Sequence, residues 1–181
     1  MSLFVVSEEQ VLQIAHETAG RYGLPPLIVQ AVIQHESMGD VWAWNAEPRY
    51  RWFWDVRGGK PFRPVTAAEA AAEVPPKDFK ACKGVDPDAE WWGQQASWGL
   101  MQVMGAVARE RGFAGRFLNE LHDPVLNVDI GCKHLAAYAK RYLGRLGWAG
   151  VLRAYNGGPY AAMHNTNSGY PLKIAALIDG G

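Results

Sequence analysis

Helix start and stop signals constrain the fold more than any other feature of this sequence. Residues 7–10 (Ser-Glu-Glu-Gln) have the capping-box pattern, and Pro25-Pro26 and Asp123-Pro124 suit the first turns of further helices. Apolar residues follow at helical spacing, and no run shows sustained strand alternation. The predicted helices cover about residues 8–20, 25–39, 66–75, 123–143, 148–154 and 171–178. The fold class is therefore predicted to be mainly α.

The stretch from residue 42 to residue 93 has a different character. It holds six prolines, and seven of the eight tryptophans lie between residues 42 and 98. Proline interrupts helices and strands, so we expect irregular structure here. With 181 residues, the chain fits one domain, residues 1–181, with an insertion at about 42–95.

The charge balance excludes one broad class of function. Lys plus Arg and Asp plus Glu each total 18, so the formal net charge is zero. Proteins that bind nucleic acid through its phosphates need clustered positive charge, and we expect no nucleic-acid partner. The hydrophobic fraction of 49% is enough for a sizeable core.

Several further features are expected to be absent. The apolar stretches fall far short of the ~20 residues that span a bilayer. Residues 1–6 lack the basic start, apolar core and cleavage site of an export signal, so the mature protein is expected to start at Met1. Cys82 and Cys132 are expected to be two thiols, with one disulfide as the alternative. The five histidines show no metal-binding pattern, so neither a metal nor another cofactor is expected.

Glu36 is the carboxylate in the least favourable position for a charge. At about 100° per residue it continues an apolar stripe that contains Val29, Val32 and Ile33, near the C-terminal end of the second predicted helix. Desolvation and the partial negative charge of the helix end would both raise its pKa. Glu36 is therefore a candidate proton donor. The alternatives are a carboxylate that turns to solvent and one that pairs with an arginine.

Two short segments place polar groups beside glycines. Residues 97–102 (Ser-Trp-Gly-Leu-Met-Gln) have a flexible glycine before an apolar pair and an amide, which suits a neutral polyhydroxyl ligand. Residues 154–158 (Ala-Tyr-Asn-Gly-Gly) end a predicted helix with a phenol and an amide, which is also an ordinary C-cap. Neither segment decides a function by itself.

Five motifs occur in order along the chain. They are His35-Glu36-Ser37, Gly99-Leu100-Met101-Gln102, Asp123-Pro124 with Asn127, Ala154-Tyr155-Asn156-Gly157-Gly158, and Tyr170. In this order they resemble the lytic transglycosylases of the soluble (Slt) type, over about residues 24–41 and 96–178. The resemblance implies a lysozyme-like helical domain. It also implies cleavage of the β-1,4 bond between N-acetylmuramic acid and N-acetylglucosamine in peptidoglycan, leaving a 1,6-anhydromuramyl end.

The resemblance implies a role for each matching residue. Glu36 is similar to the family's single catalytic acid/base, and Ser37 to the small hydroxyl residue beside it. The Met101-Gln102 pair looks like the family's glycan-contacting pair. Tyr155 resembles the tyrosine that hydrogen-bonds the catalytic carboxyl, and Asn156 looks like a structural or substrate-contacting amide.

One carboxylate suffices for this reaction if the sugar supplies the second reacting group. Glycosidases usually use two carboxylates. In the implied reaction the muramyl N-acetyl oxygen is an internal nucleophile, and deprotonated Glu36 takes the proton of the O6 hydroxyl so that O6 attacks C1. The same residue is then acid and afterwards base, and water is not the acceptor.

The long segment between the Glu-Ser and Gly-Leu-Met-Gln motifs departs from the family's usual pattern. It looks like segments of phage and prophage members, which are endolysin-like. It contains Asp40, Glu47 and Asp55, and any of these acting as a second carboxylate would make the protein a muramidase-type hydrolase. A catalytically silent cell-wall-binding or virion module is a third hypothesis.

The tryptophans of this segment have two interpretations. Their faces would stack on sugar rings, or they would fill a small core. We expect most of them to fill that core, because so proline-rich a segment needs large side chains to bury. Trp98, beside Gly99, is the best candidate for contacting glycan.

The expected partner is the glycan strand of peptidoglycan, bound by a monomer. Because no export signal is found, the protein is expected to be made in the cytoplasm and to act on periplasmic peptidoglycan. Phage lysis, a virion or a secretion device would then bring it to its substrate.

Overall fold

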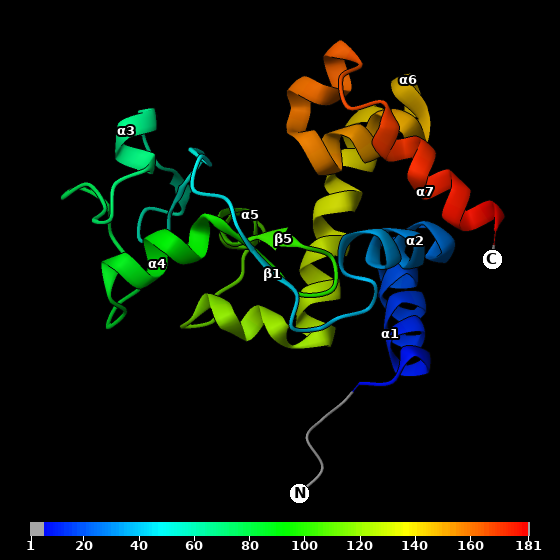
Figure 1. The fold of residues 1–181 in the computed structure, drawn as a ribbon, viewed down its shortest axis with the longest axis horizontal. Helices are drawn as coiled ribbons and strands as arrows, with labels where there is room; N and C mark the ends of the chain where they lie inside the picture. Colours follow the sequence, from blue (N-terminus) through cyan, green and yellow to red (C-terminus); the bar gives the residue numbers. More distant parts are fainter. Residues whose placement is uncertain (1–5, 181) are drawn as a thin grey trace, which may run out of the picture. The chain divides into compact units, whose positions relative to one another are not determined.

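The computed structural model describes residues 6–180 and contains two compact units (Figure 1). Unit 1 consists of Met1–Gly39 and Gly131–Gly181, and unit 2 consists of Asp40–Ile130. The predicted start at Met1, and most of the stretch searched for an export signal, lie outside the described residues. The predicted insertion falls within unit 2, and its origin as an insertion into a single domain stays a prediction.

Unit 1 is built from helices. They are α1 (Glu8–Arg21), α2 (Pro26–Ser37), residues 131–164 of α6 (Pro124–His164), and α7 (Gly169–Asp179). Helix α2 packs against both α1 and α7 (Figure 1). Its apolar stripe of Val29, Val32 and Ile33 is buried, as the helical spacing predicts.

The predicted start and end signals of α1 and α2 are confirmed. The Ser7 hydroxyl accepts a hydrogen bond from the Gln10 amide, and the Gln10 side chain accepts one from the Ser7 amide, which completes the capping box. Helix α2 begins with proline in its first turn and ends at Ser37. Met38 follows in the left-handed region, with φ of 54°.

Two glycines interrupt α6. Gly147 has φ of 61° and Gly158 has φ of 72°, and neither conformation is helical. The helices predicted at about 123–143 and 148–154 therefore correspond to the segments on either side of Gly147. The predicted stop at the glycine pair is confirmed at Gly158, but a further segment to His164 follows it because Pro159 suits the first turn of a helix.

Unit 2 contains two small antiparallel sheets that the sequence did not indicate. Strands β1 (Trp44–Ala46), β4 (Ala96–Trp98) and β5 (Val103–Met104) form one sheet in the order β1-β4-β5. Strands β2 (Trp54–Asp55) and β3 (Lys60–Pro61) form the other. Strands of two or three residues are too short to show alternation of polar and apolar residues, so pattern analysis misses them.

The helices of unit 2 are short: α3 (Ala67–Ala70), α4 (Pro87–Gln94), α5 (Gly105–Glu110) and the 3-10 helix η1 (Leu118–His122). The helix predicted at about 66–75 begins at the expected capping box of Thr66 but is shorter, because it ends at Ala70, well before the prolines that were expected to close it. The prediction of irregular structure to residue 93 is wrong for α4. The start of α4 is marked in the sequence by Asp86-Pro87, an N-cap residue followed by proline in the first turn.

Unit 2 has its own aromatic core, made of Phe53, Val65, Ala70, Phe79 and Trp91. The rings of Phe53 and Trp91 stack with centroids 3.7 Å apart. Trp91 is the tryptophan in this core, whereas Trp42, Trp44 and Trp52 are 67%, 54% and 69% exposed. The prediction that most tryptophans fill the core is therefore wrong.

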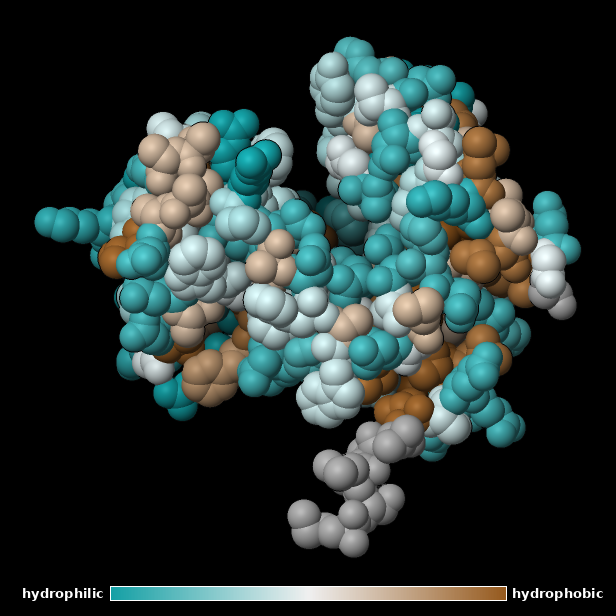
Figure 2. Space-filling model, viewed as in Figure 1, coloured by the Kyte–Doolittle hydropathy of each residue, from teal (hydrophilic) through white to brown (hydrophobic). Residues whose placement is uncertain are grey.

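Hydrophobic side chains also gather over α7 on the face shown in Figure 2. Leu172, a residue of this helix, is 70% exposed. Between residues 6 and 180, no helix has both the length and the apolar character needed to cross a membrane. Cys82 lies in unit 2 and Cys132 in unit 1, and neither forms a disulfide.

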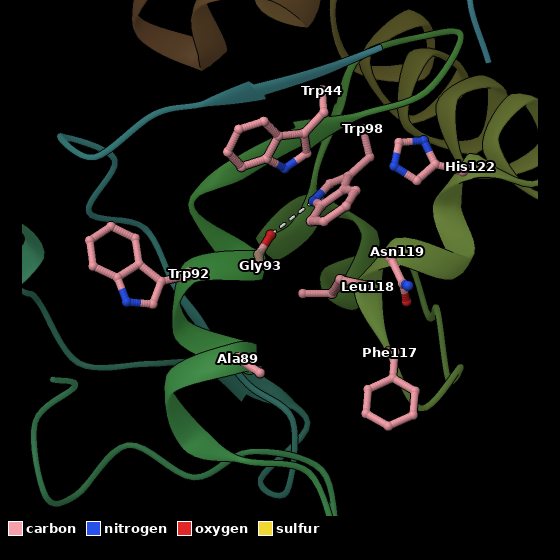
Figure 3. A pocket seen from close by; sticks show the side chains of 9 residues that line it. All are labelled: Trp44, Ala89, Trp92, Gly93, Trp98, Phe117, Leu118, Asn119 and His122. Carbon is pink, nitrogen blue, oxygen red and sulfur yellow. Dashed lines mark hydrogen bonds between the residues drawn. The ribbon is translucent and has the colours of Figure 1, made fainter. Parts of the chain in front are cut away.

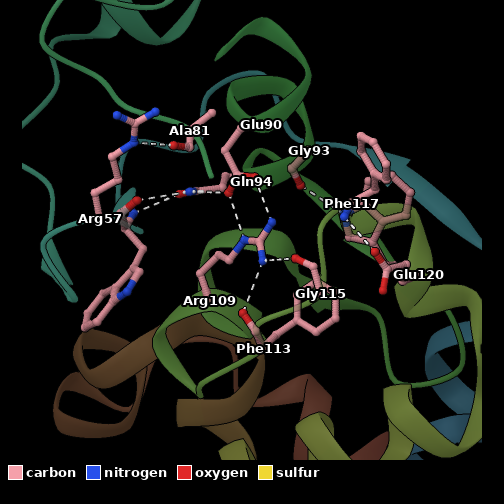
Figure 4. A network of polar contacts seen from close by, with 12 residues as sticks. Arg57, Ala81, Glu90, Gly93, Gln94, Arg109, Phe113, Gly115, Phe117 and Glu120 are labelled. Carbon is pink, nitrogen blue, oxygen red and sulfur yellow. Dashed lines mark hydrogen bonds and ion pairs between the residues drawn. The ribbon is translucent and has the colours of Figure 1, made fainter. Parts of the chain in front are cut away.

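A buried ion pair connects three parts of unit 2 (Figure 4). Two nitrogens of Arg109 on α5 donate to the two carboxylate oxygens of Glu90 on α4, at 2.9 and 2.8 Å. The third nitrogen donates to the carbonyls of Phe113 and Gly115. Gln94 donates to Glu90 and exchanges two hydrogen bonds with the main chain of Trp54. The network therefore fixes α4, α5 and β2 to one another.

Glu90→Ala is expected to destabilise the protein by about 3–5 kcal/mol, because it leaves the Arg109 guanidinium buried without its counter-charge. Equilibrium urea unfolding measures the loss. Asp78→Asn is the control, because the ion pair of Asp78 with Arg63 is exposed and its loss is expected to change stability little. Equal effects of the two substitutions would contradict a structural role for the buried pair.

Candidate active site

The carboxyl group of Glu36 lies in the last turn of α2 and is largely shielded from water. Tyr170 at the start of α7 donates a hydrogen bond from its hydroxyl to Oε1 of Glu36, at 2.5 Å. Asn156 on α6 supplies a second side-chain hydrogen bond. The hydrogen-bond partners of the carboxyl are therefore neutral side chains. The carboxyl is buried, so the two alternatives from the sequence, a carboxylate that turns to solvent and one that pairs with an arginine, do not describe it.

Burial raises the pKa of Glu36 above its ordinary value. The hydrogen bonds from Tyr170 and Asn156 act in the opposite direction, because they stabilise the ionised form, but they are the smaller effects. The direction agrees with the prediction from the apolar stripe. The geometry thus provides a carboxyl that holds a proton to higher pH than an exposed glutamate and still has hydrogen bonds for its anion.

Tyr170 is held in place by its own neighbours. It is only 4% exposed, and its ring and that of His35 meet in a T-shaped arrangement, with centroids 5.2 Å apart. Burial and the charge of Lys173 lower the pKa of His35, so the imidazole favours its neutral form. Burial and the nearby charge of Glu36 raise the pKa of Tyr170, which keeps its hydroxyl a hydrogen-bond donor.

Asn156 is oriented by a second asparagine. The side-chain nitrogen of Asn167 donates to the side-chain oxygen of Asn156, which turns the NH₂ group of Asn156 toward Glu36. Asn167 has φ of 57°, a conformation that asparagine adopts more readily than most residues. The resemblance included Tyr170 without a role, and no sequence motif indicated Asn167.

Tyr155 and Ser37, both expected in the site, lie in unit 1 with Glu36. Burial, and to a smaller extent the charge of Glu36, raise the pKa of Tyr155, and the centroid of its ring lies 5.6 Å from that of His134. The hydroxyl of Ser37 donates to the Ile33 carbonyl and accepts from the Gly39 amide. The resemblance assigned a hydrogen bond with Glu36 to Tyr155. In the structure, Tyr170 makes such a bond. Contact of Ser37 or Tyr155 with substrate stays a prediction.

The Gly-Leu-Met-Gln motif forms a tight turn in unit 2 between β4 and β5. Gly99 has φ of 64°, and a Cβ there would lie 2.7 Å from the carbonyl oxygen of Leu121, so only glycine fits. The side chain of Asn127 accepts from the Met101 amide and donates to the carbonyls of Trp98 and Leu121. This buried amide therefore anchors the turn to η1 and to the start of α6.

Gln102 and Met101 have different surroundings within this turn. The side-chain amide of Gln102 donates to the carbonyls of Ala43 and Gly99 and accepts from the Ser97 hydroxyl, so the position of this side chain is fixed. Met101 is 0% exposed, and in this conformation its side chain offers no surface to a glycan. Its predicted contact with glycan is therefore not supported, because the thioether packs inside the protein.

The remaining candidates also lie in unit 2. Trp98 is partly buried, and its indole nitrogen donates to the Gly93 carbonyl at 2.9 Å. Asp40 accepts from the Trp42 amide, Glu47 from the Asn45 side chain, and Asp55 from the amides of residues 57 and 58. Each carboxylate thus has a local partner in a turn. Among the described residues, no group of three or more His, Cys, Asp or Glu is arranged to hold a metal ion.

Tyr170→Phe is expected to raise the pKa of Glu36 further, because the lost hydrogen bond favours the ionised form. An NMR titration of the Glu36 side-chain carboxyl measures the change. Tyr160→Phe in the same unit is the matched control, since Tyr160 is 67% exposed, and it should leave the titration unaltered. A lowered or unchanged pKa in Tyr170→Phe would show that the hydroxyl does not stabilise the carboxylate.

Three comparisons with known proteins bear on this arrangement. The model of the transglycosylase SLT domain family matches residues 13–178. Neither the curated proteins nor the solved structures contain a match to the chain. Because the family match spans most of both units, the chain belongs to the transglycosylase SLT domain family and is a lytic transglycosylase that acts on peptidoglycan.

Proposed function

We propose that the chain cleaves the β-1,4 bond between N-acetylmuramic acid and N-acetylglucosamine and forms 1,6-anhydromuramyl ends, with Glu36 as the single acid/base. The observation that carries the proposal is the shielded Glu36 carboxyl, whose partners Tyr170 and Asn156 are neutral and whose pKa is raised. A group that must first give and then take a proton works best when neither form is strongly disfavoured.

In the first step, protonated Glu36 donates its proton to the glycosidic oxygen while the bond from that oxygen to C1 of the muramyl residue breaks. The N-acetyl oxygen of the same sugar bonds to C1 and holds the developing positive charge. The raised pKa of Glu36 supports this step, since it increases the fraction of enzyme that carries the proton near neutral pH.

In the second step, the Glu36 carboxylate takes the proton of the O6 hydroxyl, and O6 attacks C1 as the bond to the N-acetyl oxygen breaks. Glu36 regains its proton, and no water is consumed. The hydrogen bonds from Tyr170 and Asn156 stabilise the carboxylate during its brief existence. Asn167 contributes by orienting Asn156.

The muramidase alternative requires a second carboxylate, and no observation favours it. Asp40, Glu47 and Asp55 accept hydrogen bonds in their own turns, which accounts for their presence without a catalytic role. A monomeric state, a phage origin and the route to the cell wall stay predictions from the sequence.

Glu36→Gln is expected to retain the fold. Its rate of digestion of purified sacculi is expected to fall by a factor of roughly 10² or more, because glutamine cannot transfer the proton. Mass spectrometry of the soluble products measures both the rate and the type of end. Glu17→Gln, an exposed substitution of the same kind on α1, should digest sacculi at the wild-type rate.

The products separate the three hypotheses. Anhydromuramyl ends from the wild type, and their loss in Glu36→Gln, support the proposal. Reducing ends would identify a hydrolase, and loss of those ends in one of Asp40→Asn, Glu47→Gln or Asp55→Asn would identify its second carboxylate. Intact sacculi after incubation with folded wild-type protein would leave only a binding module.

A further inference from the structure

Unit 2 contains a pocket of about 720 Å³ that none of the steps above uses (Figure 3). This volume lies in the range of small-molecule sites, about 300–1,000 Å³. It is lined by Trp44, Ala89, Trp92, Gly93, Trp98, Phe117, Leu118, Asn119 and His122, from β1, α4, β4 and η1 and the residue before η1. We call it the tryptophan pocket.

Exposed aromatic faces dominate the tryptophan pocket. Trp44, Trp92 and Phe117 remain 54%, 39% and 46% exposed although each is large and apolar. Trp44 and Trp98 meet edge to face, with centroids 6.2 Å apart, as they approach the same hollow (Figure 3). Rings that only filled a core would be covered, as Trp91 is at 0% exposure on the same helix as Trp92.

Two of the three tryptophans, Trp92 and Trp98, are held by hydrogen bonds that leave their faces available. The indole nitrogen of Trp92 donates to the carbonyl of Glu73 at 3.2 Å, and that of Trp98 donates to the carbonyl of Gly93 at 2.9 Å. The polar atom of each ring is thus used within the protein. Rings fixed in this way lose little conformational entropy when a ligand stacks on them.

The polar groups of the pocket suit an uncharged ligand. None of its nine lining residues is Lys, Arg, Asp or Glu. Asn119 contributes an amide, which both donates and accepts hydrogen bonds. Nδ1 of His122 lies 2.9 Å from the carbonyl oxygen of Val41, and because a carbonyl only accepts, Nδ1 is the donor of this bond and Nε2 is the ring nitrogen that can pair with a ligand.

We propose that the tryptophan pocket is an additional sugar-binding site, and that its ligand is an N-acetylglucosamine unit of a glycan strand. The pyranose ring places its C–H face on the aromatic faces, and its hydroxyl and acetamido groups pair with Asn119 and His122. The absence of charged lining residues selects this sugar over N-acetylmuramic acid, which carries a carboxyl group. The choice of a glycan rests on the proposed function.

Helix α4 connects this site to the core of unit 2. Its Trp91 stacks on Phe53 in the core, while its next residue, Trp92, lines the pocket. The same helix carries Glu90 of the buried ion pair. The pocket wall is therefore rigidly attached to the unit, as a site that stacks on sugars requires.

The test titrates the full-length Glu36→Gln protein with chitotetraose, the β-1,4 tetramer of N-acetylglucosamine, and follows the indole N–H signals by ¹⁵N NMR. The signals of Trp44, Trp92 and Trp98 should shift together and saturate. Trp52, which is 69% exposed and outside the pocket, should not shift. These signals report binding in the pocket itself, even if the sugar also binds elsewhere.

Trp92→Ala is expected to weaken binding seen at the Trp44 signal by roughly three- to tenfold, through loss of one stacking face. Trp92→Phe should retain most of the affinity, because a ring remains. Trp52→Ala is the matched control and should bind like the parent. Should Trp92→Ala misfold, Trp44→Ala followed at the Trp92 signal provides the same test.

Saturable shifts confined to the pocket, with the expected loss in Trp92→Ala, support the proposal. Absence of saturable shifts at these three indoles, or an equal loss in Trp52→Ala, overturns it. Failure of the proposed function is a separate result, since it appears as absent anhydromuramyl ends in the wild-type digest and does not depend on the indole signals.

Discussion

The constraint on which unit 1 depends is that a carboxyl group shielded from water must have hydrogen-bond donors. Glu36 follows an apolar stripe on α2, so its side chain lies where water is largely excluded. The donors come from two other helices, Tyr170 from α7 and Asn156 from α6. Side chains of three helices therefore meet at this one group, and its pKa stays raised because the effect of burial exceeds that of the hydrogen bonds.

A second carboxyl, Glu90, is buried in unit 2 but is stabilised in a different way. Its two oxygens are bonded to the guanidinium of Arg109, whose remaining donors reach main-chain carbonyls. A charged and fully bonded partner makes Glu90 a structural anchor. The neutral partners of Glu36 leave its proton available. The chemical character of the partner, more than burial itself, thus separates the reactive carboxyl from the structural one.

The tryptophans show how local structure divides residues of one type between two roles. On α4, adjacent side chains point about 100° apart, so Trp91 enters the core while Trp92 lines the pocket. In the sheet, Trp44 and Trp98 are paired across β1 and β4 and therefore project to the same side. A proline-rich segment with few helical turns can thus form both a small core and a concave aromatic surface.

The sequence by itself determined the main helices, the family and the position of Glu36, because capping boxes, helical spacing and short motifs are local properties. It could not determine the short strands, since two or three residues carry no readable period, and α4, α5 and η1 were not predicted from it. It also could not determine which groups contact Glu36. Tyr170 and Asn167 are far from Glu36 along the chain, and only packing of α7 against α2 and the turn before α7 bring them to the carboxyl. Burial of Met101 and exposure of the tryptophans were likewise decided by the tertiary structure, because the exposure of a side chain depends on neighbours that are distant in sequence.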